Sequence, residues 1–179
     1  MTSLVLELRA GELMVVNGTA LRFRSRARVE LVGRARFLFG KQVMSPEEAN
    51  TPARRIYFAL QTAYVGPEDL REAAMAELHR LVGEFQDATT SALARQLLDR
   101  ALALAESEDW YAALKNVRIV MRHEAAVLGL EMPAGVAVDS SRADLPSVHA
   151  RRPAAAGREP GPRPQRTGQD GPRRRGTRD

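Results

Sequence analysis

The sequence predicts an α+β protein, in which a small antiparallel N-terminal β-sheet is followed by an antiparallel helical bundle and a disordered C-terminal tail. Apolar residues alternate with polar ones before residue 32 and then recur at helical spacing between Ser45 and Leu128. From Pro133 onward the chain holds seven of its ten prolines and no Phe, Tyr or Trp, too little apolar surface to offset the entropy of ordering. The expected parts are a basic β-rich head (1–43), a helical region packed on it (44–132) and the tail (133–179).

The head begins with short strands joined by tight turns. Leu4, Leu6 and Leu8 alternate with other residues, and a second apolar run covers 13–16. Asn17-Gly18 follows that run, and both residue types accept the positive φ that a two-residue hairpin turn requires. A further strand is expected at 35–39.

A row of arginines forms the most distinctive segment of the head. Between Leu21 and Leu31 apolar and small residues share one parity, and the other parity is taken by Arg22, Arg24, Arg26, Arg28 and Glu30. A single strand would place all four guanidinium groups on one face, but eleven residues is long for a strand, so a turn or bulge is expected near Ser25. The row is interpreted as a contact for a polyanion, because guanidinium groups donate paired hydrogen bonds to phosphate. The alternative is an ordinary half-exposed strand in which Glu30 pairs with one arginine.

Two helix starts follow the head. Ser45-Pro46-Glu47-Glu48 has the pattern of a capping box with proline in the first turn. Thr51-Pro52 repeats the device, and a longer helix is expected there with its apolar stripe at Ile56, Ala59, Leu60, Ala63 and Tyr64, ending at Gly66-Pro67.

Three more amphipathic helices are expected to complete the bundle. The first spans about 67–85, with Leu70, Ala74, Leu78, Leu81 and Phe85 on its apolar stripe. The second spans about 90–105, with Leu93, Leu97, Ala101 and Leu104. Asp109 caps the last, whose stripe holds Trp110, Leu114, Val117, Met121 and Leu128 before Gly129 ends it.

Charge is divided unevenly along the chain, whose formal net charge is +5. Residues 1–41 hold eight cations against three acids, 42–132 hold nine against fourteen, and 133–179 hold ten against five. The basic head therefore suits nucleic acid, and the acidic helical surface suits a protein partner or plain solvent.

Several function classes are excluded or disfavoured. The chain has no cysteine, so neither disulfides, thiolate catalysis nor cysteine-based zinc sites are possible. His79, His123 and His149 lie far apart in sequence, and there is no phosphate-binding glycine loop or nucleophile motif, so we expect no catalysis, no metal and no cofactor. No apolar run is long enough to span a bilayer, so a cytoplasmic protein without membrane contact is expected.

Two segments resemble the FlbT family of flagellar post-transcriptional regulators. They are 6–18 and 44–61, and the most recognisable string is Thr51-Pro-Ala-Arg-Arg-Ile-Tyr-Phe58 within a resemblance that covers roughly Leu4 to Leu130. The resemblance implies binding to the 5′ untranslated region of flagellin mRNA, repression through mRNA decay, and the regulator FlaF as a partner. The family usually has a charged string resembling Arg-Glu-Lys-Asp before the capping box. In this chain the corresponding residues are 39–43, and only Lys41 matches that string.

The combined prediction is an RNA-binding repressor of flagellum biogenesis that is not an enzyme. The residues predicted to contact RNA share a positive charge and exposure: Arg22, Arg24, Arg26, Arg28, Arg34, Lys41, Arg54 and Arg55. Arg54 and Arg55 would form an anion site with the N–H groups of the helix start, or would pair with Glu47 or Glu48. Tyr57 or Phe58 would stack on a base, unless they belong to the core. The alternative function is a helical adaptor or chaperone for a flagellar protein. The oligomeric state stays open.

Overall fold

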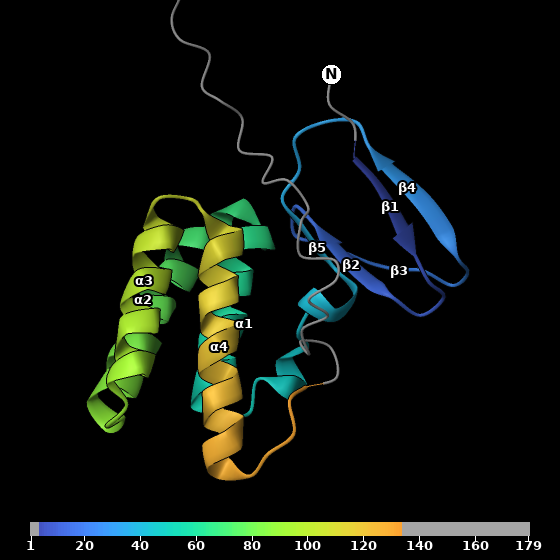
Figure 1. Cartoon of the computed structure of the whole chain (residues 1–179). Coiled ribbons are helices and arrows are strands. Elements are labelled where there is room, and N and C mark those ends of the chain that lie inside the picture. Colours follow the sequence, from blue (N-terminus) through green and yellow to red (C-terminus); the bar gives the residue numbers. More distant parts are fainter. Residues whose placement is uncertain (1–3, 134–179) are drawn as a thin grey trace, which may run out of the picture. The chain divides into compact units, whose positions relative to one another are not determined.

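The computed structural model describes residues 4–133, which lie within one compact unit. Five strands precede four helices in this part of the chain (Figure 1). The strands are β1 (Leu4–Leu8), β2 (Leu13–Val16), β3 (Thr19–Arg22), β4 (Ala27–Leu31) and β5 (Phe37–Phe39). The helices are α1 (Pro52–Val65), α2 (Arg71–Ala88), α3 (Ala92–Glu106) and α4 (Trp110–Leu128). Three single 3-10 turns, η1 (Gly40–Gln42), η2 (Pro46–Glu48) and η3 (Glu68–Leu70), join them.

This architecture confirms the α+β prediction, with one correction: the strands form two small antiparallel sheets rather than one. β1 pairs only with β4, and the second sheet has the order β3-β2-β5. Residues 23–26 between β3 and β4 belong to no strand, which confirms the expected interruption near Ser25. The two strands on either side of it lie in different sheets. The predicted disorder of the tail and its histidine, His149, lie outside the described residues apart from Pro133.

β2 connects the two sheets with the helices because its side chains alternate between two apolar cores. Met14 is buried with Leu6 and Leu8, and Val16 packs on the same cluster. Leu13 and Val15 point the other way and pack on the helical core. The three-stranded sheet therefore lies between the β1–β4 pair and α1, as the alternation of a strand buried on both sides requires.

Local capping signals set most element ends. Asn17 and Gly18 form the β2–β3 turn with φ values of 45° and 83°, which confirms the hairpin. The N–H of Ser45 donates to the Glu48 carboxylate at 2.8 Å, which confirms the capping box. Side-chain oxygens of Thr51, Ser91 and Asp109 cap α1, α3 and α4, and Gly129 ends α4 in the left-handed conformation.

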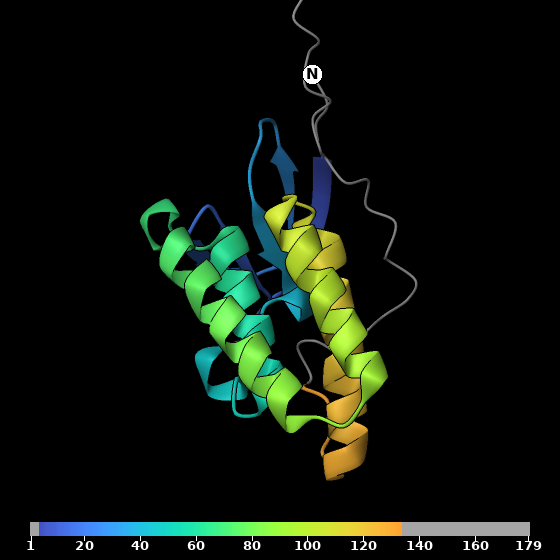
Figure 2. The same cartoon turned by 90° about the vertical axis from the view of Figure 1, so that its left-hand side faces the viewer.

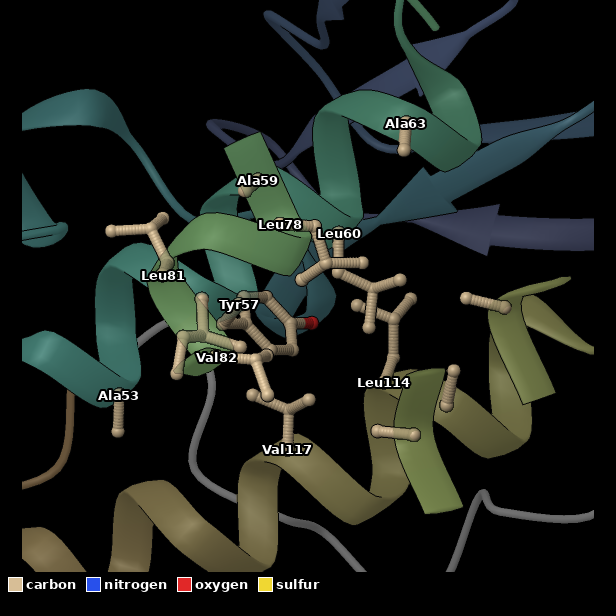
Figure 3. Packing of buried hydrophobic residues seen from close by; sticks show 14 of the residues in the cluster. Ala53, Tyr57, Ala59, Leu60, Ala63, Leu78, Leu81, Val82, Leu114 and Val117 are labelled. Carbon is tan, nitrogen blue, oxygen red and sulfur yellow. The ribbon is translucent and has the colours of Figure 1, made fainter. Parts of the chain in front are cut away.

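The four helices form the predicted bundle. α1 packs on α2 and α4, and α3 packs on α4. Figures 1 and 2 together show α1 and α4 lying between the strands and the α2–α3 pair. The shared core buries large side chains from all four helices, among them Tyr57, Leu60, Leu78 and Leu114 (Figure 3) and Leu98 of α3.

Three leucines predicted on the apolar stripes are exposed instead: Leu70, Leu93 and Leu128 are 48%, 57% and 54% exposed. Leu70 lies in the η3 turn before α2 begins, so helical spacing does not apply to it. In α3 the buried residues Ala94, Leu98 and Ala105 each lie one position beyond the predicted Leu93, Leu97 and Leu104, and Ala101 is buried as predicted. Small alanine side chains on this face let α3 lie close to its neighbour, and packing thus selects a face that hydrophobicity alone ranks lower.

Hydrogen bonds hold the head in a defined position on α1. The N–H of Gly18 donates to the carbonyl of Val65 at 2.6 Å. Gln61 exchanges two hydrogen bonds with the backbone of Met44, at 2.8 and 2.9 Å.

Among residues 4–133, no helix combines the length and apolar character that crossing a bilayer requires.

Candidate nucleic-acid interface

The arginine row lies at the edge where the chain leaves one sheet and enters the other. Arg22 ends β3, Arg24 and Arg26 lie in the connection, and Arg28 lies in β4. All four side chains are exposed. The row is therefore wrapped around the edge of the head, and the single flat face expected from an uninterrupted strand is not formed.

One acid within the head partly neutralises the row, and it is Glu7 rather than Glu30, the partner named in the alternative interpretation. Glu7 accepts a hydrogen bond from Arg26 at 3.0 Å and lies opposite Arg28 in the β1–β4 register. Both members of the Glu7–Arg26 pair are more than half exposed, so the pair contributes only about 0–1 kcal/mol to stability. Within the described residues, no ion pair involves Arg22, Arg24 or Arg28.

The other predicted cations of the head are exposed but lie in different elements. Arg34 is in the loop between β4 and β5, and Lys41 is in η1. Arg36, which the sequence did not single out, is bound to Glu68, and Glu68 also pairs with Arg71 at 2.9 Å. This three-residue ion-pair network joins the head to the start of α2, so Arg36 has a structural role.

The N-terminus of α1 already holds an anion, the carboxylate of Glu124 from α4. Glu124 is only 9% exposed and accepts hydrogen bonds from the N–H of Ala53, at 2.9 Å, and from the hydroxyl of Thr51. A carboxylate at this position is stabilised by the helix dipole. The expected phosphate site at the helix start is therefore wrong, because Glu124 occupies its N–H group.

The side chains of Arg54 and Arg55, in the first turn of α1, have different environments. The Arg54 guanidinium donates to Asn50 at 2.8 Å and to the backbone carbonyl of Glu131 at 2.5 Å, so it holds the segment after α4 against α1. Arg55 is exposed. In residues 4–133 neither arginine forms an ion pair with Glu47 or Glu48, the alternative partners expected from the sequence.

Tyr57 is a core residue, so its predicted stacking on a base is wrong. Its ring is 0% exposed and lies among core side chains that include Val82 and Val117 (Figure 3). Its hydroxyl donates to the carbonyl of Gln42 at 2.7 Å, and the Arg118 guanidinium lies 5.6 Å from its ring centroid. Burial raises the pKa of Tyr57 above its ordinary value, and the charge of Arg118 opposes that rise.

Phe58 is half-buried and packs on the same core, which leaves only part of its ring accessible.

Groups of at least three histidine or acidic side chains suited to a metal do not occur among the described residues. The exposed arginines and lysine predicted to contact RNA thus make this surface of the head cationic.

Comparison with known proteins gives one consistent family. The family model described as "Flagellar protein FlbT" matches residues 4–128. The "Probable flagellum biosynthesis repressor protein FlbT 2" of Bradyrhizobium diazoefficiens is 34% identical over 138 residues, which cover 75% of this chain and 94% of that protein. The "Probable flagellum biosynthesis repressor protein FlbT" of Brucella anthropi is 34% identical over 130 residues, covering 72% and 84%, respectively. No solved structure matches the chain. A family match over the whole described fold, with relatives matched over most of their length, shows that the chain belongs to the FlbT family of flagellar proteins.

Proposed function

We propose that this protein represses flagellum biosynthesis by binding the 5′ untranslated region of flagellin mRNA through its arginine row. The family supports the flagellar part, since its relatives are named flagellum biosynthesis repressors. The observation that carries the RNA part is the exposure of Arg22, Arg24 and Arg28 without an ion pair in the described chain.

The wrapped position of the row suits a single strand better than a duplex. A single-stranded backbone is flexible and can follow the bend between β3 and β4, and each guanidinium can donate two hydrogen bonds to a phosphate. These contacts read charge rather than base sequence, so they position the transcript, and recognition of a particular leader requires further contacts. Arg34 and Lys41 are exposed cations of the same head and extend the proposed contact.

The exposed acids of α2 restrict where RNA can bind. Glu72, Glu77, Glu84 and Asp87 are all exposed on this helix, and although Arg80 pairs with Glu77 and Glu84, the group keeps a net negative charge that repels a polyanion. RNA is therefore expected on the head and not on the α2 face. Decay of the bound message is assigned to a separate nuclease in this proposal.

The test is a salt titration of binding between the full chain and a transcript of the flagellin leader. Each phosphate contact on a single strand contributes about −0.7 to the slope of log affinity against log salt. The variant R22A/R24A/R28A is expected to have a slope that is less negative by about 2 units, because it lacks three such contacts. Filter binding or fluorescence anisotropy measures both slopes.

Arg100→Ala is the matched control, because Arg100 is an exposed arginine on α3, away from the head. Its slope and affinity should equal those of the wild type. An unchanged slope for the triple variant would contradict the proposal.

The alternative function is a helical adaptor or chaperone for a flagellar protein such as FlaF, with an indirect effect on RNA. The exposed acids of α2 favour it, because such a surface suits a protein partner. This alternative would be supported by a pure leader transcript that fails to bind at any salt concentration.

A further inference from the structure

We propose that a second copy of this chain binds an apolar groove at the end of the helical bundle, forming a two-fold symmetric dimer. The groove has a volume of about 340 Å³ and lies where α1 begins and where α2 and α4 end. We call it the basal groove, and its lining includes Arg55, Leu81, Glu84, Phe85, Val127 and Leu128. The proposal does not depend on RNA binding.

The first argument is the exposure of large apolar side chains at this place. Val127 and Leu128 line the basal groove and are 70% and 54% exposed, and Leu130 beside them is 46% exposed. Together they are three of the eight large apolar side chains exposed in residues 4–133. Contiguous apolar patches of this kind mark interaction sites on soluble proteins.

The second argument is that the groove combines an apolar hollow with exposed apolar side chains at its edge, so a second copy offers matching groups. Among its lining residues, Leu81 of α2 is buried and Phe85 half-buried, so they form the floor, whereas Val127 and Leu128 of α4 are more than half exposed and form the rim. A two-fold axis beside the rim would insert Val127 of each copy into the hollow of the other. Such isologous contacts form the commonest class of homo-oligomer.

The third argument is the charge on the two walls. Arg55 lies on the α1 wall and Glu84 on the α2 wall, so the apolar floor runs between opposite charges. Glu84 is held by Arg80 of its own helix, whereas Arg55 has no ion pair within the described residues. In a two-fold dimer Arg55 of one copy faces Glu84 of the other, and this pairing occurs twice. A second copy thus supplies both the apolar side chains and the charges that the groove requires.

The groove leaves the arginine row free. The head is held at the other end of α1, through the hydrogen bond from Gly18 to Val65. Dimerisation through the basal groove would therefore place two RNA-binding heads on one particle without covering either.

The first test is sedimentation equilibrium of the full chain in the absence of RNA. The wild type is expected to form a particle of twice 19.7 kDa, in equilibrium with the monomer. Val127→Asp should raise the dissociation constant by ~10-fold or more, because each copy loses an apolar contact and buries a charge. Circular dichroism verifies that the variant folds, as expected for a side chain that is 70% exposed.

Leu93→Asp is the matched control, since Leu93 is an exposed leucine of α3 that does not line the groove. Its dissociation constant should equal that of the wild type. A wild type that stays monomeric up to ~100 µM, or equal dissociation by both variants, would overturn the proposal.

The second test exchanges the charges of the walls. Arg55→Glu and Glu84→Arg should each weaken the dimer, because each places like charges opposite one another at two points. An equimolar mixture of the two variants should dimerise more tightly than either alone, since the mixed dimer restores two opposite-charge contacts. Single variants that dimerise like the wild type, or a mixture that gains nothing, would overturn the assigned pairing.

Discussion

Glu124 caps a helix from a remote position in the chain. Its carboxylate sits at the start of α1 and binds the Ala53 N–H and the Thr51 hydroxyl, although more than 70 residues separate it from both. Thr51 also receives the N–H of Arg54, at 3.4 Å. The start of α1 is therefore satisfied by one local residue and one distant residue, and the distant residue ties α4 to α1.

Replacement of Glu124 should reveal how much this cap contributes. Glu124→Ala is expected to lower the free energy of unfolding by about 2–3 kcal/mol, because it leaves a buried N–H group and hydroxyl without a partner. Glu124→Gln should cost less, about 1 kcal/mol, because its amide can still accept from Ala53 and donate to Thr51 while losing the charge. Urea denaturation measures both values.

Glu106→Ala serves as the control for this comparison. Glu106 is exposed and, among residues 4–133, its one ion-pair partner is His79 at 3.4 Å, so its removal should cost about 0–0.5 kcal/mol. Equal losses for Glu106→Ala and Glu124→Ala would show that the buried cap contributes nothing special.

At the scale of elements, the β2–β3 hairpin is held tightly against the end of α1. Gly18 adopts a positive φ of 83° and donates its N–H to Val65. A Cβ atom at this position would lie 2.9 Å from the backbone nitrogen of Pro67. Both the turn conformation and the close approach of two backbones therefore require glycine here.

Gly18→Ala is expected to lower the free energy of unfolding by about 1–3 kcal/mol, since the variant combines backbone strain with a clash that only movement of the head can relieve. Gly33→Ala is the control, because a Cβ atom at Gly33 would meet no atom within 4 Å and the residue lies outside the positive φ range. It should be neutral or slightly stabilising. Thermal or urea unfolding of the two variants separates the outcomes, and similar stabilities would contradict the proposed close contact.

At the scale of the whole described molecule, the two apolar cores share the three-stranded sheet. Met14 and Val16 serve the head core, and Leu13 and Val15 serve the helical core, from adjacent positions of the same strand. Loss of β2 from either core would disrupt the other. The head and the bundle are therefore expected to unfold together.

This cooperativity can be checked with Trp110, the only tryptophan of the chain. Trp110 is 7% exposed and stacks on Tyr64 with ring centroids 5.9 Å apart, so its fluorescence reports the helical core. Hydrogen exchange of the β2 amides across a urea titration reports the head. Both probes should give one midpoint, as a two-state transition requires. A lower midpoint for β2 would show that the head unfolds separately.

The sequence by itself determined the features that depend on near neighbours. These features include the hairpin at Asn17-Gly18, the capping box at Ser45 and the cap at Thr51. Each involves residues only a few positions apart, so the residue types alone predict it. Periodicity likewise predicted four amphipathic helices, and the unusual length of the alternating run predicted the break in the arginine row. The exposed cations of the candidate site were found in the same way, because alternation alone places Arg22, Arg24 and Arg28 opposite the apolar positions.

Only the tertiary structure decided which distant groups meet. It showed that Glu7 rather than Glu30 pairs with the arginine row, that Glu124 fills the start of α1, and that Tyr57 belongs to the core. It also showed the basal groove, whose walls come from three helices. Such contacts join residues tens of positions apart, and they form only when whole helix and sheet faces pack against each other. A shift of one residue in that packing changes which side chain is buried. The spacing of neighbouring residues in the sequence therefore does not predict these contacts.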